Sequence, residues 1–447
     1  MDHAGEGDTS EAIEPRTCMA DGVLHVVWAE NRGGIPGVWF NTSADGGKSW
    51  LPSDVQINHA PADAEAPDVA CAGDMVYVVW EDERDGELLN HNIYAAVSSD
   101  GGQTFGEDTR LDGDIDGEAM SLGPRAAAVG DSVYVAWFDN SQGAYDIRVQ
   151  ASRNKGGSWL SDPSRADSDE AGSAYSAWPT LGASEDGVVV AWEDSRDGGN
   201  DIYASASTTG EDFSSDQRLD IGDDAGASNS FEPRLVMDGQ LAAVAWYDER
   251  NAVRDIYMNV SLDAGDSWSG EAIRVDADIT GQADSLHPDL TTEDGRVFVV
   301  WQDDRSGGYD IYERVYDTSA GTLSEEEVRL DTDADGESQS YYPRISVDGD
   351  HVFVVWQDYR ADKNAVGFND LYYNYSANGG IDWNEDDLRI NSNEPGSSYA
   401  IAASAGIVGE SFVSLWQDGR KGTADIYGAT RELGVESVYV APEGNEE

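Results

Sequence analysis

The sequence predicts an all-β protein, a single β-propeller of four-stranded antiparallel blades, and three observations support this fold class. An apolar run that ends in Trp occurs eight times along the 447 residues, at intervals of 52, 57, 55, 54, 55, 55 and 60 residues. Turn residues divide each unit into four short apolar segments, and no segment has helical length or period. A repeat of this length indicates one supersecondary unit stacked on its neighbours. The tryptophans are Trp28, Trp80, Trp137, Trp192, Trp246, Trp301, Trp356 and Trp416.

The strand pattern is clearest in the sixth unit. Residues 288–293 predict a first strand, and the Asp294-Gly295 pair predicts a tight turn. Residues 296–301 are almost continuously apolar, which is typical of a strand buried on both faces. A glycine-rich polar loop then separates this strand from a third at 311–316 and a fourth at 326–331.

The eight units are expected to close into one propeller domain over residues 1–447. The last unit can end with a strand at 435–440, so eight complete blades close the ring without exchanging a strand. A ring of seven blades with one divergent unit outside it is the alternative. The expected blades are 11–58, 64–112, 121–167, 176–220, 230–276, 285–331, 340–391 and 398–440.

A turn before the fourth strand carries a family resemblance. Ser43, Asp45, Gly47 and Trp50 have the spacing S-x-D-x-G-x-x-W. The same spacing recurs, fully or nearly, at 98–105, 152–159, 261–268 and 376–383. This turn resembles the Asp-box, or BNR, repeat of the sialidase-like propellers, and the resemblance extends over the whole chain. In that family the turn is structural and lies away from the catalytic face.

The resemblance also raises sialidase-type hydrolysis. Such enzymes use an arginine triad for the sugar carboxylate, a Tyr–Glu pair and an Asp acid/base, and they carry an R-I-P motif near the N-terminus. This chain has Glu14-Pro15-Arg16 there and no R-I-P. No Tyr–Glu–Asp set stands out from the repeats, so no catalytic residue is transferred. The six histidines show no zinc-binding spacing.

The charge of the chain limits its partners. Acidic residues number 88 and basic residues 27, which gives a net charge of −61. Such a surface repels nucleic acids and anionic membranes, and it suits a halophilic or marine setting where salt screens its self-repulsion. An ordinary secreted acidic protein is the alternative. No apolar run is long enough to span a bilayer. We expect an extracellular or cell-surface protein, monomeric, whose signal segment is not in this chain.

The two cysteines lie at nearly equivalent places in the first two units. Cys18 precedes its repeat Trp by ten residues and Cys71 by nine. In a strand, an offset of one residue turns the side chains to opposite faces. Free, buried thiols are therefore expected, with a disulfide as the alternative.

Two linkers between units match the start of a calcium loop. Their D-x-D-x-D-G pattern places carboxylates at alternate positions before a glycine, as hard cations require. The Glu that ends a true EF-hand loop is absent, since Gly123 and Tyr342 stand in its place. Chance in a very acidic chain is the alternative to calcium binding. The predicted calcium ligands are Asp112, Asp114, Asp116, Asp331, Asp333 and Asp335.

Arginines alternate around the expected axis. A Pro stands thirteen residues before the Trp in units one to seven, and Arg follows it in the odd units, at Arg16, Arg125, Arg234 and Arg344. Asp68, Thr180 and Asp289 follow it in the even units. We favour an inter-blade ladder of Arg–Asp contacts. The functional alternative is a ring of guanidinium groups for an anionic ligand.

The W-x-D-x-R loops also repeat, and we interpret them as structural. Each Arg is expected to pair with the Asp before it and with the Asp five residues further on, as in Asp194, Arg196 and Asp201. Exceptions to the repeat are more informative. Arg148 replaces the usual Tyr in the third unit, and His91 lies in the lengthened loop of the second. Both are candidate ligand-binding residues.

Two function classes remain. The first choice is a secreted or surface binding module that recognises a glycan or protein through its loop face, assisted by calcium. The alternative is a secreted exo-glycosidase of sialidase type. Membrane insertion and nucleic-acid binding are not expected.

Overall fold

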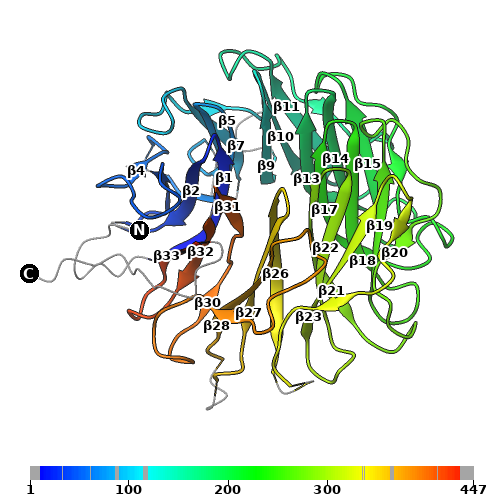
Figure 1. The fold of residues 1–447 in the computed structure, drawn as a ribbon. Helices are drawn as coiled ribbons and strands as arrows, with labels where there is room; N and C mark the ends of the chain where they lie inside the picture. Colours follow the sequence, from blue (N-terminus) through cyan, green and yellow to red (C-terminus); the bar gives the residue numbers. More distant parts are fainter. Residues whose placement is uncertain are drawn as a thin grey trace, which may run out of the picture.

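The computed structural model describes residues 11–432, apart from 33, 61, 86–89, 114–118, 335, 337, 363–366 and 410. These residues form eight antiparallel sheets arranged in a ring, and the described part of the chain contains no helix (Figure 1). The eight-bladed prediction is confirmed, and the seven-bladed alternative is wrong. The described residues hold no helix that could cross a membrane. The predicted strand at 435–440 lies outside the described residues.

Strands follow each other outward from the axis in every blade. The innermost strands are β1 (Ala12–Ala20), β5 (Ala64–Ala72), β9 (Ser121–Val129), β13 (Ser176–Ser184), β17 (Ser230–Asp238), β21 (Ser285–Glu293), β26 (Ser340–Asp348) and, in blade eight, β30 (Ala400–Ile401) with β31 (Gly406–Val408). The second strands are β2 (Val23–Glu30), β6 (Met75–Asp82), β10 (Ser132–Asp139), β14 (Gly187–Asp194), β18 (Leu241–Asp248), β22 (Arg296–Asp303), β27 (His351–Asp358) and β32 (Ser411–Asp418).

The outer strands are shorter. The third strands are β3 (Gly37–Ser43), β7 (Asn92–Ser98), β11 (Asp146–Ser152), β15 (Asp201–Ser207), β19 (Asp255–Ser261), β23 (Asp310–Asp317), β28 (Asp370–Ser376) and β33 (Asp425–Glu432). The fourth strands are β4 (Val55–Gln56), β8 (Thr109–Arg110), β12 (Ser164–Arg165), β16 (Gln217–Arg218), β20 (Ile273–Arg274), β25 (Val328–Arg329) and β29 (Leu388–Arg389), and blade six adds β24 (Thr322–Leu323) beside β23.

The repeat tryptophans fill the spaces between blades, which is why the period predicts the fold. All eight are at least 98% buried. Apolar side chains of adjacent second strands surround them, because each blade packs one face against the next. Blade eight closes the ring on blade one: the amide of Ala12 donates to the carbonyl of Ala424 at 2.8 Å, and Trp28 shares a core cluster with Leu415.

The W-x-D-x-R loops are structural, as predicted, but their pairing differs from the expectation. Nε1 of Trp192 donates to Asp194 at 2.9 Å, Nε of Arg196 donates to the same carboxylate at 2.8 Å, and the guanidinium lies 4.1 Å from the ring centre of Tyr203. Asp201 does not bind this arginine. It binds Arg218 of the fourth strand at 3.1 Å, so two arginines, not one, hold this loop.

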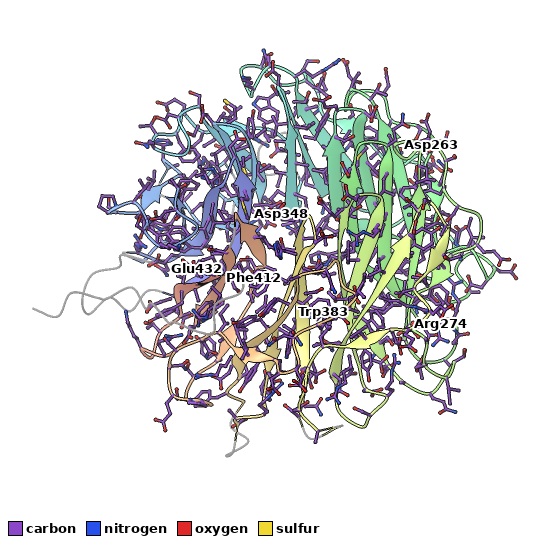
Figure 2. The ribbon with its side chains drawn as sticks, in the orientation of Figure 1. Asp263, Arg274, Asp348, Trp383, Phe412 and Glu432 are labelled. Atoms are coloured by element: carbon purple, nitrogen blue, oxygen red, sulfur yellow. A yellow bond between two sulfur atoms is a disulfide. The ribbon has the colours of Figure 1, made fainter. Side chains whose placement is uncertain are left out.

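The turns that resemble the Asp-box have the hydrogen bonds expected of a local structural motif. In blade five, Oγ of Ser261 accepts from the amide of Gly265 and Asp263 accepts from the amide of Ser267, both at 2.8 Å. The amide of Ala264 donates to Gln240 in the inner hairpin of the same blade. The Asp-box turns and inner hairpins therefore share one end of the propeller, and Asp263 lies at its outer edge in the view of Figure 2.

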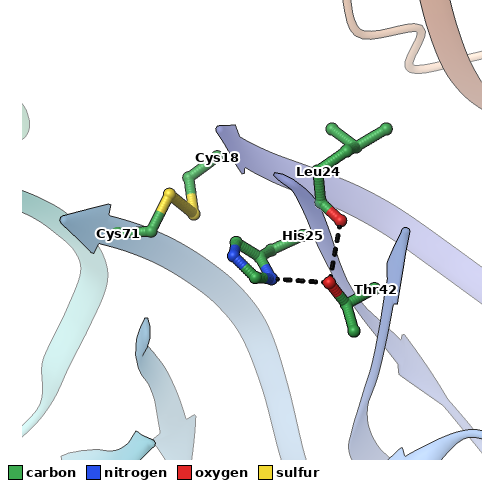
Figure 3. The surroundings of a disulfide bond; sticks show 5 residues. All are labelled: Cys18, Leu24, His25, Thr42 and Cys71. Carbon is green, nitrogen blue, oxygen red and sulfur yellow. Dashed lines mark hydrogen bonds between the residues drawn. A yellow bond between two sulfur atoms is a disulfide. The ribbon is translucent and has the colours of Figure 1, made fainter. Parts of the chain in front are cut away.

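Cys18 and Cys71 form a disulfide between β1 and β5, so the prediction of free thiols is wrong (Figure 3). Their Cα atoms are 5.9 Å apart. The one-residue offset does point the two side chains to opposite faces of their own blades. Adjacent blades, however, meet through opposite faces, so this offset is what brings the sulfur atoms together. The bond sits at the blade interface near His25, whose pKa burial lowers to about 4.

Candidate functional site

A β-bulge interrupts the innermost strand in blades one to seven, and the same strand is split in blade eight. At each bulge one residue has a positive φ, between 48° and 63°. Residues other than glycine rarely adopt this backbone conformation, which costs them roughly 1–2 kcal/mol. Bulges redirect side chains, often beside active sites. These bulge residues are Glu14, Ala66, Gly123, Trp178, Glu232, His287, Tyr342 and Ala402.

Six of the eight bulge residues line two cavities on the ring axis, with volumes of about 570 and 590 Å³. The second cavity takes lining residues from the innermost strands of blades one to seven and from the segment between β30 and β31 in blade eight. The two share Gly123, Arg125, Trp178 and Arg234, so we treat them as one axial pocket. Its volume is in the range of small-ligand sites.

The four predicted arginines come together in this axial pocket. Burial and the nearby charge of Arg16 lower the pKa of Arg125, and burial together with Arg344 lowers the pKa of Arg234 to about 10. Within the described part of the chain, no carboxylate forms an ion pair with any of the four. The guanidinium groups of Arg125 and Arg344 each donate only to the carbonyl of the preceding Pro, at 3.0 Å.

The expected ladder of Arg–Asp ion pairs is not present. Oδ2 of Asp68 accepts from the amide of Ala126 at 2.9 Å, and Oδ2 of Asp289 accepts from the amide of Ile345 at 3.0 Å. Each aspartate thus binds the backbone of the next blade rather than its arginine. The guanidinium groups remain available to an anion in the axial pocket.

Aromatic side chains form one wall of the axial pocket. Trp178 is 54% exposed although it packs against Phe138, with ring centres 5.2 Å apart. Tyr175 and Tyr247 line the same cavity. Tyr342, 44% exposed, is not among the lining residues, and its ring centre lies 4.5 Å from that of His287. Exposed aromatic rings held in place by neighbours provide a flat apolar surface for a ligand.

Two glutamates in the axial pocket have opposite pKa shifts. Burial raises the pKa of Glu193 to about 7, although it accepts from the amide of Glu232 at 2.9 Å. Burial also acts to raise the pKa of Glu232, but the hydrogen bond from His287, at 2.7 Å, and the charges of Arg234 and Arg344 lower it overall. Near neutral pH one carboxyl can hold a proton while its neighbour is ionised.

The other two predicted ligand-binding residues lie outside the axial pocket. Arg148, on β11, lies 3.8 Å from Asp139 and 3.9 Å from Asp146, and so takes part in the outer ion pairs of its own blade. His91 lies just before β7, close to Glu81 and Glu83. Only Glu81 of this group reaches the pocket wall.

The predicted calcium ligands that the structure describes accept hydrogen bonds from arginine side chains. Asp331 accepts from Nε of Arg329 at 3.1 Å and Asp333 from Nη2 at 2.8 Å, with Asp310 on the same nitrogen at 2.9 Å. These carboxylates each accept a hydrogen bond from a guanidinium, and one oxygen of each of Asp310, Asp331 and Asp333 also lies within 4.8 Å of the other two. Asp112 likewise binds Arg110, at 2.6 Å. Asp114, Asp116 and Asp335 lie outside the described residues.

No protein-family model and no curated protein matches the chain. The polysaccharide lyase Uly1 has a similar structure, with a TM-score of 0.51 at 12% identity, covering 85% of this chain and 93% of that one. A PL25 ulvan lyase matches with a TM-score of 0.46 at 11% identity, covering 95% and 96%. The GH93 α-L-arabinofuranosidase of Fusarium graminearum matches with a TM-score of 0.44 at 14% identity, covering 70% of this chain and 94% of that one. At these identities the likeness concerns the fold alone.

The arginines of this site were predictable from the sequence, whereas its bulge residues were not predicted. The available signal was the residue just before each repeat Pro, which differs from blade to blade while the Pro recurs. A residue before Pro normally favours an extended backbone, so the sequence did not indicate the positive φ of Trp178 and Tyr342. Glu193 and Tyr247 follow their repeat Trp directly, where the register alone does not show that they face the axis.

Proposed function

We propose that the axial pocket binds an anionic carbohydrate and that the protein acts as a glycan-recognition propeller. The observation that carries the proposal is the set of four arginines that line the pocket without ion-pair partners among the described residues. In a protein of net charge −61, placing four unpaired guanidinium groups on one axis is costly, and a bound carboxylate or sulfate would offset that cost.

The rest of the pocket supports a sugar as the carrier of that anion. Trp178 offers an exposed ring face beside the arginines, as a pyranose ring requires, and Tyr175 and Tyr247 line the same cavity. A polysaccharide lyase shares the fold, which agrees with a carbohydrate ligand. The Asp-box turns agree with the proposed relationship to sialidase-like propellers.

Isothermal titration with acidic and neutral oligosaccharides tests this proposal. Uronate-containing, sialylated and sulfated sugars should bind, and neutral sugars of equal length should bind at least tenfold more weakly. Replacement of Arg125 or Arg234 by Gln should weaken acidic-sugar binding by roughly 10- to 100-fold, as expected for one charge-assisted hydrogen bond. Arg153, exposed at the opposite end of blade three, gives the matched control R153Q. Equal binding of acidic and neutral sugars would reject the proposal.

Glycoside hydrolysis is the second candidate, and the Glu193–Glu232 pair favours it. A protonated and an ionised carboxyl in one site is the arrangement glycosidases use, with Glu193 as the acid and Glu232 as base or nucleophile. Mass spectrometry of wild-type protein incubated with a bound oligosaccharide would detect product. E193Q and E232Q should then lose at least 100-fold in rate while retaining binding. Binding of the sugar without product formation would reject hydrolysis and support glycan recognition only.

We further place the protein outside the cell, as a monomer. The Cys18–Cys71 disulfide supports an oxidising compartment, where such bonds persist. Calcium assistance stays a prediction from sequence, and the grouping of Asp310, Asp331 and Asp333 supplies oxygens for such an ion. Titrations repeated with calcium and with EDTA would test it directly, with tighter sugar binding in calcium as the predicted result.

A further inference from the structure

Blade two departs from the repeat at its loop end, beside the axial pocket. Glu65 on β5 and Glu81 on β6 are directly opposite each other in the strand pairing, and His91 precedes β7. Two like charges directly opposite in a sheet are destabilising. Blade three has Leu122, Phe138 and Tyr145 at the corresponding positions, and they pack together as part of an apolar cluster. Apolar residues can therefore fill these positions, but blade two has two glutamates and a histidine there.

The side chains of this group converge on one point. Single ligand atoms of Glu65, Glu81 and His91 all lie within 4.8 Å of one another. Oε1 of Glu81 accepts from the amide of Gly123 at 2.7 Å, and its Oε2 lies 3.3 Å from Nδ1 of His91. Glu81 is 7% exposed and His91 8%. Glu81 and His91 are therefore shielded from water, whereas Glu65 is exposed, and the first oxygen of Glu81 is fixed while the second faces the histidine.

His91 lacks the hydrogen bond that a buried histidine normally makes. Its Nδ1 is buried and makes no hydrogen bond, although a carboxylate oxygen is near. Buried polar atoms without partners are rare and indicate an absent ligand or ion. Oδ1 of Asp63, two residues before Glu65, is likewise buried without a hydrogen bond. Nε2 of His91 lies 3.4 Å from Glu83. The carboxyl groups of Glu65, Glu81 and Glu83 thus lie close to one imidazole.

We propose that Glu65, Glu81 and His91 bind a divalent transition-metal cation, for which zinc and manganese are suitable probes. One imidazole nitrogen with two carboxylates is a ligand set that such ions accept, whereas calcium prefers oxygen alone. Metal–ligand bonds of about 2.0–2.2 Å require only a small inward movement of these side chains. The cation would neutralise the facing carboxylates and give Nδ1 its missing partner.

The site is distinct from the proposed sugar site and does not depend on it. It shares only Glu81 with the pocket wall, and that side chain holds the bulge at Gly123 through its other oxygen. A bound cation would fix this bulge. Loss of sugar binding by an arginine variant would leave metal binding unchanged, so the two proposals can fail separately.

Calorimetric titration of EDTA-treated protein with ZnCl2 and MnCl2, in 1 M KCl to screen the acidic surface, tests the proposal. One ion should bind per chain, H91A and E65Q should weaken binding at least tenfold, and calcium should not compete. His59, an exposed histidine paired with Asp108, gives the control H59A, which should bind like wild type. A zinc-induced rise in melting temperature should occur in wild type and H59A only.

Cobalt provides a second readout that does not depend on stability. Co²⁺ bound to wild type should give visible absorption bands of a nitrogen- and oxygen-ligated ion, and H91A should lose them. Binding of several ions with equal weakness in wild type and H91A would overturn the proposal, as would competition by calcium at equal concentration.

Discussion

At the scale of single residues, the positions that differ between blades have side chains that blade packing does not require. Strained bulge residues differ from blade to blade, while the buried tryptophans do not. Glu313 is a further exception. It lies in the core between blades six and seven, where Val300 is its strand partner, and its Oε1 has no hydrogen-bond partner. Burial raises the pKa of this carboxyl to about 8.

Glu313 should make stability fall as pH rises. A carboxyl whose pKa is raised on folding stabilises the folded state below its unfolded pKa, near 4.3, and this contribution is lost as pH rises through about 8. E313Q cannot ionise, so it should be more stable than wild type at pH 9 and similar at pH 5. Denaturant unfolding of both proteins at the two pH values measures this. An equal difference at pH 5 and pH 9 would show that Glu313 is not ionising.

At the scale of elements, the strands were predictable and the contacts between blades were not. The alternation of apolar runs and turns located the strands of the sixth unit to within a few residues, from β21 to β25. The bulge in each innermost strand follows from packing around the axis, which a single blade's sequence does not encode. The arginine ring was found because its residues recur with the period, whereas Glu193 and Glu232 gave no periodic signal.

The prediction of free cysteines was wrong because it did not consider how neighbouring blades pack. Side-chain direction was read within one sheet, but the disulfide joins the facing surfaces of β1 and β5. Replacement of both Cys18 and Cys71 by Ser should lower the free energy of unfolding by roughly 2–4 kcal/mol, because the bond restricts the unfolded chain.

Denaturant unfolding of the double variant measures this loss, and reduced wild-type protein should reproduce it. Thiol alkylation of the unfolded, non-reduced wild type supplies the control and should label neither cysteine. Labelling of both would contradict the bond.

At the scale of the whole molecule, repulsion among the acidic residues, which give a net charge of −61, lowers stability. The four axial arginines are a local concentration of positive charge within this negative protein. The Debye length falls from about 10 Å at 0.1 M salt to about 3 Å at 1 M, so salt should screen repulsion across the acidic surface. The melting temperature should therefore rise between 0.1 M and 2 M KCl. Sucrose at matched osmolality should raise it less, because it does not screen charge. An equal rise in both would point to solute exclusion instead.

The central claim is that the axial arginines recognise the negative charge of a sugar. It is tested most directly by comparing a uronate oligosaccharide with its carboxyl-reduced form, which differs only in that charge, against wild type and R234Q. Wild type should bind the uronate at least tenfold more tightly than the reduced sugar, and R234Q should remove most of this difference. Equal affinity of wild type for the two sugars, or an unchanged preference in R234Q, would contradict it.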